Sequence, residues 1–167
     1  MKKTSFQTIL MAGIVLLFSC QKERMPESAK DVNVLEVPMA AHKANGGGPY
    51  VLNMLVHLSG ENEVPAVNTT AKGRVHLRLT ADRILYSKIM VDQLEEGDAL
   101  RFAHVHLGAT GVNGPVRIFL AHTPDDFGKN MVQTLTPEQY DLLLNEEVYA
   151  NAHSNFYPMG IVRGQIR

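Results

Sequence analysis

Apolar and polar residues alternate regularly in the chain after residue 50. Leu52, Met54, Val56 and Leu58 recur at every second position, and residues 74–79 (RVHLRL) alternate in the same way. A period of two places the apolar side chains on one face of an extended strand and the other side chains on the opposite face. The pattern therefore predicts half-buried β-strands that share one core.

Further strands are expected where β-forming residues are concentrated, at residues 84–91, 102–107, 116–120, 147–154 and 161–166. About seven strands at this spacing are typical of an all-β fold, either a Greek-key or immunoglobulin-like sandwich or a small barrel. One short helix is expected among them. Thr136 can cap its start, Pro137 suits its first position, and Gln139 completes a capping box.

The first residues of the chain resemble an export signal. Lys2 and Lys3 precede an apolar run of about ten residues, which is too short to span a bilayer but right for a secretory signal core. Cys20, the only cysteine, follows this run and has serine before it. These flanks resemble a bacterial lipoprotein signal, which implies a signal peptide over residues 1–19, lipid on Cys20 and anchoring to the periplasmic face or the cell surface. The alternative is a free or buried cysteine in an uncleaved anchor.

The segment 20–49 has a different character. Charges, Pro26, Pro38 and small residues mix without periodicity, and the stretch ends in Asn-Gly-Gly-Gly-Pro. This composition predicts a flexible tether between Cys20 and a folded domain over residues 50–167. Because the chain has no second cysteine, the domain has to be stable through its core alone.

The charge balance excludes one class of partner. Without the two lysines of the signal peptide, 14 basic residues face 17 acidic ones. A nucleic-acid-binding domain would show a basic surface instead. The sequence does not identify a protein or glycan partner.

Four blocks of the predicted domain are distinctive when taken together. They are LSGENEVPAV (58–67), AHVHLGATGVNGPV (103–116), LTPEQYDLLL (135–144) and VYANAHSNFYPMGIVRGQIR (148–167). These blocks resemble the CHRD domain, which is named after chordin and is also found alone in many bacterial exported proteins. The resemblance implies a β-sandwich of immunoglobulin-like or Greek-key type over nearly all of the predicted domain. The family usually has Gly-Glu before an Arg-Gly-Gln ending, and here Gly160, Ile161 and Val162 occupy that place, so no role of the acid is carried over.

Three histidines are candidate metal ligands. His104 and His106 lie two residues apart in a predicted strand, so both imidazoles point to one face. His153, in another predicted strand, is the candidate third ligand, and three neutral imidazoles would suit Zn or Cu(II). Copper–zinc superoxide dismutase also begins its metal site with a His-x-His pair and a distant histidine, but its disulfide, bridging histidine and acidic ligand have no visible counterpart here. The alternative is that these histidines only hydrogen bond to backbone or carboxylate groups.

Two acidic residues and one arginine are candidates for structural polar roles. Glu61 and Glu63 would share one face of an extended strand that ends at Pro65. Paired carboxylates occur in glycoside hydrolases, but this spacing aims both carboxylates the same way. We expect instead that they hydrogen bond to loop amides or pair with Arg163, whose charge would need a partner if buried. The glycines of residues 108–115 indicate a turn between strands, because another strand follows them.

The sequence contains no convincing catalytic set. No serine lies in a nucleophile elbow, and lipid would occupy the only thiol. The sequence therefore favours a lipid-anchored envelope protein that presents a CHRD domain as a binding or structural module rather than an enzyme. The alternative is a Zn- or Cu-binding domain with redox or hydrolytic chemistry, and its ligands would be His104, His106 and His153.

Overall fold

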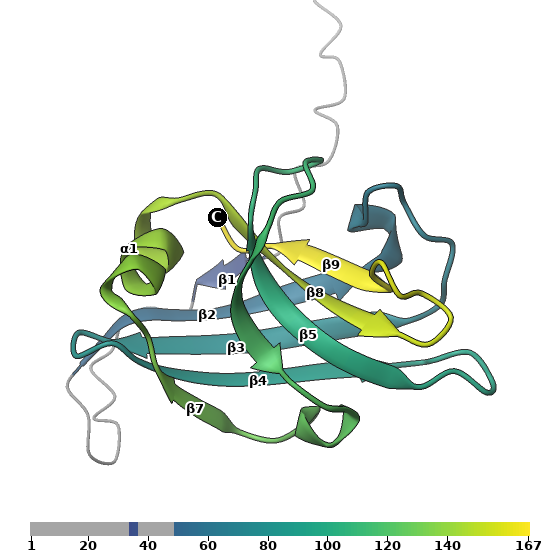
Figure 1. The fold of residues 1–167 in the computed structure, drawn as a ribbon, viewed down its shortest axis with the longest axis horizontal. Helices are drawn as coiled ribbons and strands as arrows, with labels where there is room; N and C mark the ends of the chain where they lie inside the picture. The colour runs from purple at the N-terminus through teal and green to yellow at the C-terminus, as the bar shows by residue number, and fades with distance from the viewer. Residues whose placement is uncertain (1–33, 37–48) are drawn as a thin grey trace, which may run out of the picture. The chain divides into compact units, whose positions relative to one another are not determined.

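Figure 1 shows the computed structural model of the chain, which describes residues 34–36 and 49–167. The predicted signal peptide, Cys20 and most of the predicted tether lie outside these residues. Within the described ranges, no helix is long and apolar enough to cross a membrane.

The described residues form nine strands, two short 3-10 turns and one α-helix. All strand pairs are antiparallel, and the strands follow the order β6-β5-β8-β9-β2-β3-β4-β7, with β1 paired to β2. The strands are β1 (Val34–Glu36), β2 (Tyr50–Ser59), β3 (Lys72–Thr80), β4 (Ile84–Asp92), β5 (Leu100–Leu107), β6 (Val116–Ala121), β7 (Met131–Thr134), β8 (Val148–Ser154) and β9 (Val162–Gln165). The remaining elements are η1 (Gly60–Asn62), η2 (Pro124–Asp126) and α1 (Pro137–Asn145).

The sheet folds back over itself. In Figure 1, β5, β8 and β9 lie in front of β2, β3 and β4, and α1 lies at one end. The two layers belong to one continuous sheet, so the domain is a sandwich that is nearly closed into a small barrel. The predicted all-β fold with one short helix is confirmed.

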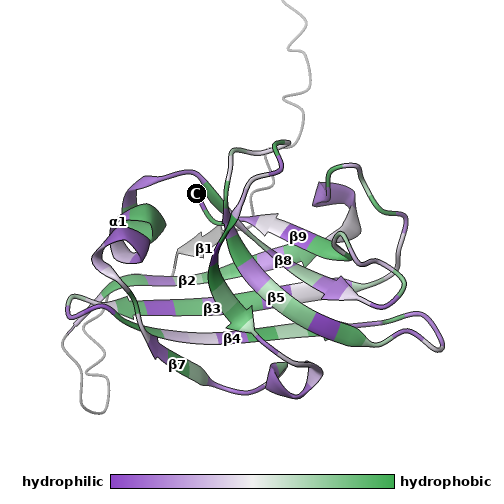
Figure 2. Cartoon of the chain, in the orientation of Figure 1, coloured by the Kyte–Doolittle hydropathy of each residue, from purple (hydrophilic) through white to green (hydrophobic). Residues whose placement is uncertain are grey.

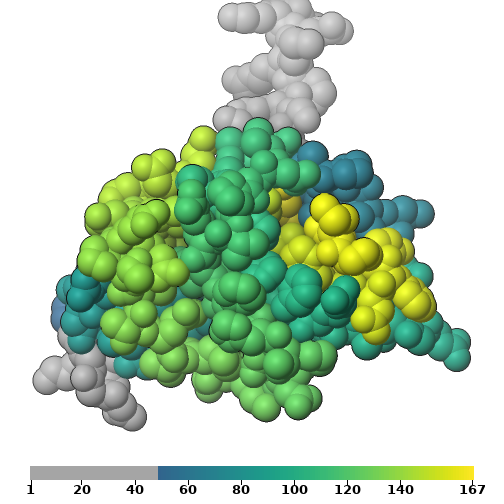
Figure 3. Space-filling model, viewed as in Figure 1, coloured from purple at the N-terminus to yellow at the C-terminus, as the bar shows by residue number. Residues whose placement is uncertain are grey.

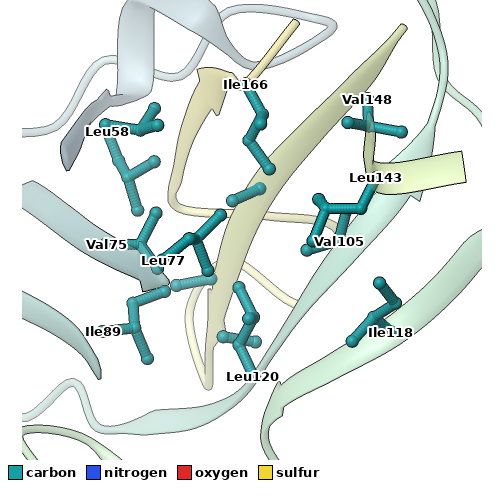
Figure 4. Packing of buried hydrophobic residues seen from close by; sticks show 14 of the residues in the cluster. Leu58, Val75, Leu77, Ile89, Val105, Ile118, Leu120, Leu143, Val148 and Ile166 are labelled. Atoms are coloured by element: carbon teal, nitrogen blue, oxygen red, sulfur yellow. The ribbon is translucent and has the colours of Figure 1, made fainter. Parts of the chain in front are cut away.

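The alternating residues fill the space between the layers. Green and purple segments alternate along β2 and β3 in Figure 2, and the apolar residues on one face of each are buried. Side chains from both layers and from α1 point into one interior in Figure 4. Each fully buried aliphatic side chain contributes about 1.5–3 kcal/mol, so this core can stabilise the domain without a disulfide. The labelled residues are Leu58, Val75, Leu77, Ile89, Val105, Ile118, Leu120, Leu143, Val148 and Ile166.

Helix α1 begins where the capping pattern predicts. The backbone N–H of Gln139 donates to Oγ1 of Thr136 at 3.2 Å, and the backbone N–H of Thr136 donates to Oε1 of Gln139 at 3.0 Å. Pro137 occupies the first helical position, where its missing N–H costs nothing. Leu142 and Leu143 are buried in the core, while Tyr140 and Leu144 pack against it.

Two glutamine side chains bind the outer edge of β6. Nε2 of Gln133, on β7, donates to the carbonyl oxygen of Phe119 at 2.8 Å, and Nε2 of Gln139 donates to that of Arg117 at 2.8 Å. Exposed strand edges favour pairing with other chains, so covering their carbonyl groups protects the edge.

Strand β7 has only four residues, and the sequence patterns did not predict it.

We expect Gln133→Ala to lower the free energy of unfolding by about 1 kcal/mol, because it removes the hydrogen bond to Phe119 O. Chemical denaturation of the variant and of a Thr134→Ala control, which changes an exposed residue of the same strand, measures the effect. Equal stability of the two variants would show that the edge contact does not stabilise the fold.

Candidate metal centre

His104 and His106 on β5 and His153 on β8 lie together on the outer face of the sheet. One ring nitrogen from each residue lies within 4.8 Å of the others. The ring centroids are 5.2 Å apart for His104 and His153, 5.5 Å for His104 and His106, and 6.4 Å for His106 and His153. The three residues singled out from the sequence thus form one cluster.

The pairing of β5 with β8 brings the histidines together. His104 lies opposite Asn151, and His106 lies opposite Tyr149. Because side chains alternate along β8, Tyr149, Asn151 and His153 share the face that carries the two histidines of β5. The opposite face of β5 carries Ala103 and Val105, which are buried in the core.

The cluster is buried although it lies on the outer face. The exposed fractions of His104, His106 and His153 are 6%, 8% and 6%. Aromatic rings cover them. The ring centroid of Phe102 lies 4.7 Å from that of His153 and 5.0 Å from that of His104, and the centroid of Phe119 lies 4.5 Å from that of His104. Two polar residues that merely faced solvent would not be enclosed in this way.

Backbone carbonyl groups fix the orientation of two of the imidazoles. Nδ1 of His106 donates to the carbonyl oxygen of Gly114 at 2.8 Å, and Nδ1 of His153 donates to that of Pro158 at 3.0 Å. A carbonyl oxygen only accepts, so both Nδ1 atoms carry the proton and both Nε2 atoms of the neutral rings have a free lone pair. Metal-binding histidines are commonly oriented by such a hydrogen bond from the nitrogen that does not bind the metal.

Two ring nitrogens of the cluster have no hydrogen-bond partner. They are Nδ1 of His104 and Nε2 of His106, both buried. A buried polar atom without a partner costs about 1–3 kcal/mol. Nε2 of His153 faces Oδ1 of Asn151 at 3.1 Å, which places two acceptors together unless the amide turns its NH2 group toward the ring. A cation bound among these nitrogens would accept the lone pairs that have no hydrogen-bond partner.

Burial keeps the imidazoles neutral. It is the largest cause that lowers the pKa of all three, and the neighbouring histidines help to lower the pKa of His104 to about 4. The hydrogen bonds to Gly114 and Pro158 partly oppose this effect on His106 and His153. The Asn151 side chain also lies close enough to His106 to raise its pKa, although the geometry of the two groups does not form a hydrogen bond to Nε2. Metal ligands have to be deprotonated, so the rings are ready to bind a cation at neutral pH without losing a proton.

The spacing is compatible with one shared ion after a small adjustment. Nitrogen ligands bind Zn at about 2.0–2.1 Å, so two ligands of one ion are at most about 4.2 Å apart. Three ligands arranged evenly around one ion lie about 3.5 Å apart, so a pair at the 4.8 Å limit would close by about 1.3 Å on binding, shared between two side chains. Small rotations of the side chains can supply this change, because the ring nitrogens lie far from the backbone.

Arg163 holds the loop that orients His106. It is fully buried on β9, and its Nη2 donates to the carbonyl oxygens of Val112 at 2.8 Å and Ala109 at 3.1 Å. The same loop presents Gly114, which accepts from His106 and whose N–H donates to the hydroxyl of Tyr149 at 3.2 Å. In Figure 3 this green loop and the yellow C-terminal segment lie side by side on the near face.

The predicted turn at residues 108–115 is confirmed, because it joins the antiparallel strands β5 and β6. Gly114 has a steric role in this turn. A Cβ atom there would overlap the carbonyl group of Leu107, so a side chain cannot be accommodated without moving the loop. Substitution of Gly114 would therefore also displace the carbonyl oxygen that orients His106.

The two acidic candidates do not form a salt bridge with Arg163, which was one of their expected roles. Residues 60–62 form the turn η1 instead of extending β2, so Glu61 is exposed while Glu63 is buried. No salt bridge joins Glu63 to Arg163, whose hydrogen-bond partners are loop carbonyl oxygens and Oδ1 of Asn113. The Glu63 carboxylate packs against Gly160, and its Oε1 has no partner.

The residues that surround the histidines were not among the candidates predicted from the sequence. Tyr149 stacks on His106, with the ring centroids 4.8 Å apart and an angle of 7° between the ring planes, and Asn151 contacts His153. Alternation along VYANAHS could have placed both on the histidine face. The position of Phe119 depends on the pairing of β5 with β6, which a single sequence does not specify.

Comparison with known protein families identifies one match. Residues 54–166 match the CHRD domain family. The matched segment contains strands β3 to β9, most of β2 and all three histidines. No curated protein and no solved structure matches the chain.

Glu63→Gln should stabilise the protein at high pH but not at low pH. Burial raises the pKa of Glu63 to about 7 from its ordinary value of 4.5, and the charge of Arg163 only partly opposes this. Between these two values the folded state keeps a proton that the unfolded state releases, so stability falls as the pH rises from about 4.5 to 7. We expect a gain on the order of 2–3 kcal/mol at pH 8 and none at pH 4.

Denaturation at the two pH values measures this gain, with Glu61→Gln as the matched control because Glu61 is exposed. A gain for Glu63→Gln that is equal at both pH values would contradict the role of the buried charge.

Proposed function

The chain belongs to the CHRD domain family, and we propose that it is an exported envelope module that binds one transition-metal ion at His104, His106 and His153. One observation carries the metal assignment: three buried neutral imidazoles converge, and two of their ring nitrogens lack a hydrogen-bond partner. The chemistry of the donors suits Zn or Cu.

The enclosure of the site supports a role in holding an ion rather than in catalysis. A catalytic zinc site has three protein ligands and keeps a fourth position open for water or substrate. Here Phe102, Phe119 and Tyr149 surround the imidazoles, whose exposed fractions do not exceed 8%. A bound ion would be shielded from a substrate of ordinary size, so the module would act in metal binding or structural stabilisation.

The proposal includes the anchor. The apolar run and the flanks of Cys20 support lipid attachment at that thiol. Because β1 pairs with β2, the part of the predicted tether between Cys20 and β1 would hold the domain away from the bacterial membrane. The lipid, and not the domain, would then determine where the metal site is displayed.

We expect the full-length protein to bind one equivalent of Zn or Cu, measured by elemental analysis after loading and removal of excess metal. His106→Ala and His153→Ala should each reduce the bound metal at least tenfold, whereas His57→Ala, which changes an exposed histidine of β2, should not. Free metal at 100 times Kd should also stabilise the folded protein by about 2.7 kcal/mol. If folded wild-type protein binds no stoichiometric metal and shows no shift in Tm, the histidines have only a structural role.

Cys20→Ser should release the protein from the membrane, because the residue that would carry the lipid is lost. Detergent-phase partitioning and incorporation of labelled fatty acid test this in the exporting host. The wild-type precursor should also accumulate in the presence of globomycin, which inhibits the lipoprotein signal peptidase. A wild-type product that is unlipidated and insensitive to globomycin would contradict the anchor while leaving the metal site untouched.

A further inference from the structure

Two arginines lie over aromatic rings that contact the histidine cluster. The guanidinium carbon of Arg163 is 3.4 Å from the centroid of Tyr149, and Tyr149 stacks on His106. The guanidinium carbon of Arg101 is 5.2 Å from the centroid of Phe102, which lies against His104 and His153. Each imidazole therefore contacts an aromatic ring that has a cation close to it.

The charge of Arg163 is not cancelled by an ion pair. Its guanidinium donates to two carbonyl oxygens and an amide oxygen, all of which are neutral. The salt bridges of the described residues, Arg74–Asp92 and Arg117–Glu138, are elsewhere. The carboxylate of the buried Glu63 interacts with this guanidinium through its charge but forms no salt bridge with it. A buried cation acts strongly on nearby charges, because few water molecules screen it.

The local charges around the imidazoles are of one sign. After burial, which has the largest effect, Arg163 helps to lower the pKa of His106, and Arg101 helps to lower the pKa of His153. For His104, burial is the largest cause, and the other causes are neighbouring histidines rather than an arginine. No carboxylate is among the causes that shift the pKa of any of the three rings.

These surroundings discriminate between ions by charge. Three neutral imidazoles leave the whole charge of the ion on the complex. The cost of moving an ion into a poorly solvated site rises with the square of its charge, and repulsion by the arginines rises in proportion to it. Both effects disfavour a divalent ion relative to a monovalent one.

The number of ligands favours the same ion. Structural zinc sites have four protein ligands, and the cluster supplies three histidines. A monovalent copper ion accepts three nitrogen ligands without a fourth. Thiolate and thioether groups are the usual soft ligands of Cu(I), so here the charge and the coordination number, and not ligand softness, provide the preference.

We propose that the site selects cuprous copper, Cu(I), over Cu(II) and Zn(II); this inference rests on the proposed metal-binding function and names the ion. Arg101 and Arg163 are positioned to determine this preference through their charge without contacting the ion. A higher affinity for Cu(I) than for Cu(II) also raises the reduction potential of bound copper, by about 59 mV for each tenfold difference.

The experiment compares the affinities of the full-length wild-type protein for the three ions. Cu(I) is measured without oxygen by competition with a chromogenic cuprous chelator, and Cu(II) and Zn(II) are measured by competition with chelators of known affinity. We expect a Kd for Cu(I) at least tenfold below those for Cu(II) and Zn(II). Equal or tighter binding of either divalent ion would overturn the inference but leave the metal-binding function standing, whereas binding of no ion would overturn both.

A charge variant tests the cause of the preference. Arg101→Gln removes a cation from the exposed side of Phe102, and it should lower the ratio of Cu(I) to Cu(II) affinity about two- to fivefold. Arg78→Gln is the matched control, because Arg78 lies over Tyr50 and Tyr86, away from the histidines. Equal ratios of Cu(I) to Cu(II) affinity in Arg101→Gln and the control would overturn the electrostatic role of Arg101. Circular dichroism tests whether both variants are folded.

Discussion

Strand β8 is buried along its whole length and on both faces. The apolar core forms on one face of this strand, and the candidate metal centre forms on the other. Its inner face contributes Val148, Ala150 and Ala152 to the apolar core. Its outer face presents Tyr149, Asn151 and His153, which no second layer of the sheet covers. Side chains and loops from β5, β6 and β9 enclose this outer face, and the result is a small polar cluster surrounded by aromatic rings.

The enclosure forms a connected network. Arg163 holds the β5–β6 loop, the loop presents Gly114 to His106, and Tyr149 lies in the stack between Arg163 and His106. A fully buried arginine is costly unless its N–H groups are satisfied. Here they bind the loop, so the interactions that satisfy the charge also fix the orientation of a candidate ligand. The loop is therefore part of the site rather than a simple connection.

Local patterns predict most of the fold but not the enclosure of the site. The alternation from Leu52 to Leu58 and the capping box at Thr136 each depend on residues close in sequence, and both features are present. The spacing of His104 and His106 similarly indicated that they share a face. The burial of that face depends also on Phe119 of β6 and on the carbonyl groups of Gly114 and Pro158, and a single sequence does not specify the contacts between separate strands and loops. Strand β7 was not predicted for a related reason. Its four residues are too few to show a clear alternation, and its pairing with β4 defines it as a strand.

The role of Arg163 shows the same limit. The sequence indicated that this residue, if buried, would need a partner, and pairing with it was one of the two roles expected for Glu61 and Glu63. The structure instead satisfies the guanidinium with neutral oxygen atoms and leaves Glu63 buried against Gly160. Residue type predicts that a buried charge needs partners, but only the tertiary arrangement determines which atoms supply them.

The most direct measurement of the central claim is a crystal structure of the copper-loaded protein with anomalous diffraction data collected at the copper edge. We predict one anomalous peak at about 2.0–2.1 Å from a ring nitrogen of each of His104, His106 and His153. No peak at this cluster, or a peak held by other residues while the three rings keep their present hydrogen bonds, would contradict it.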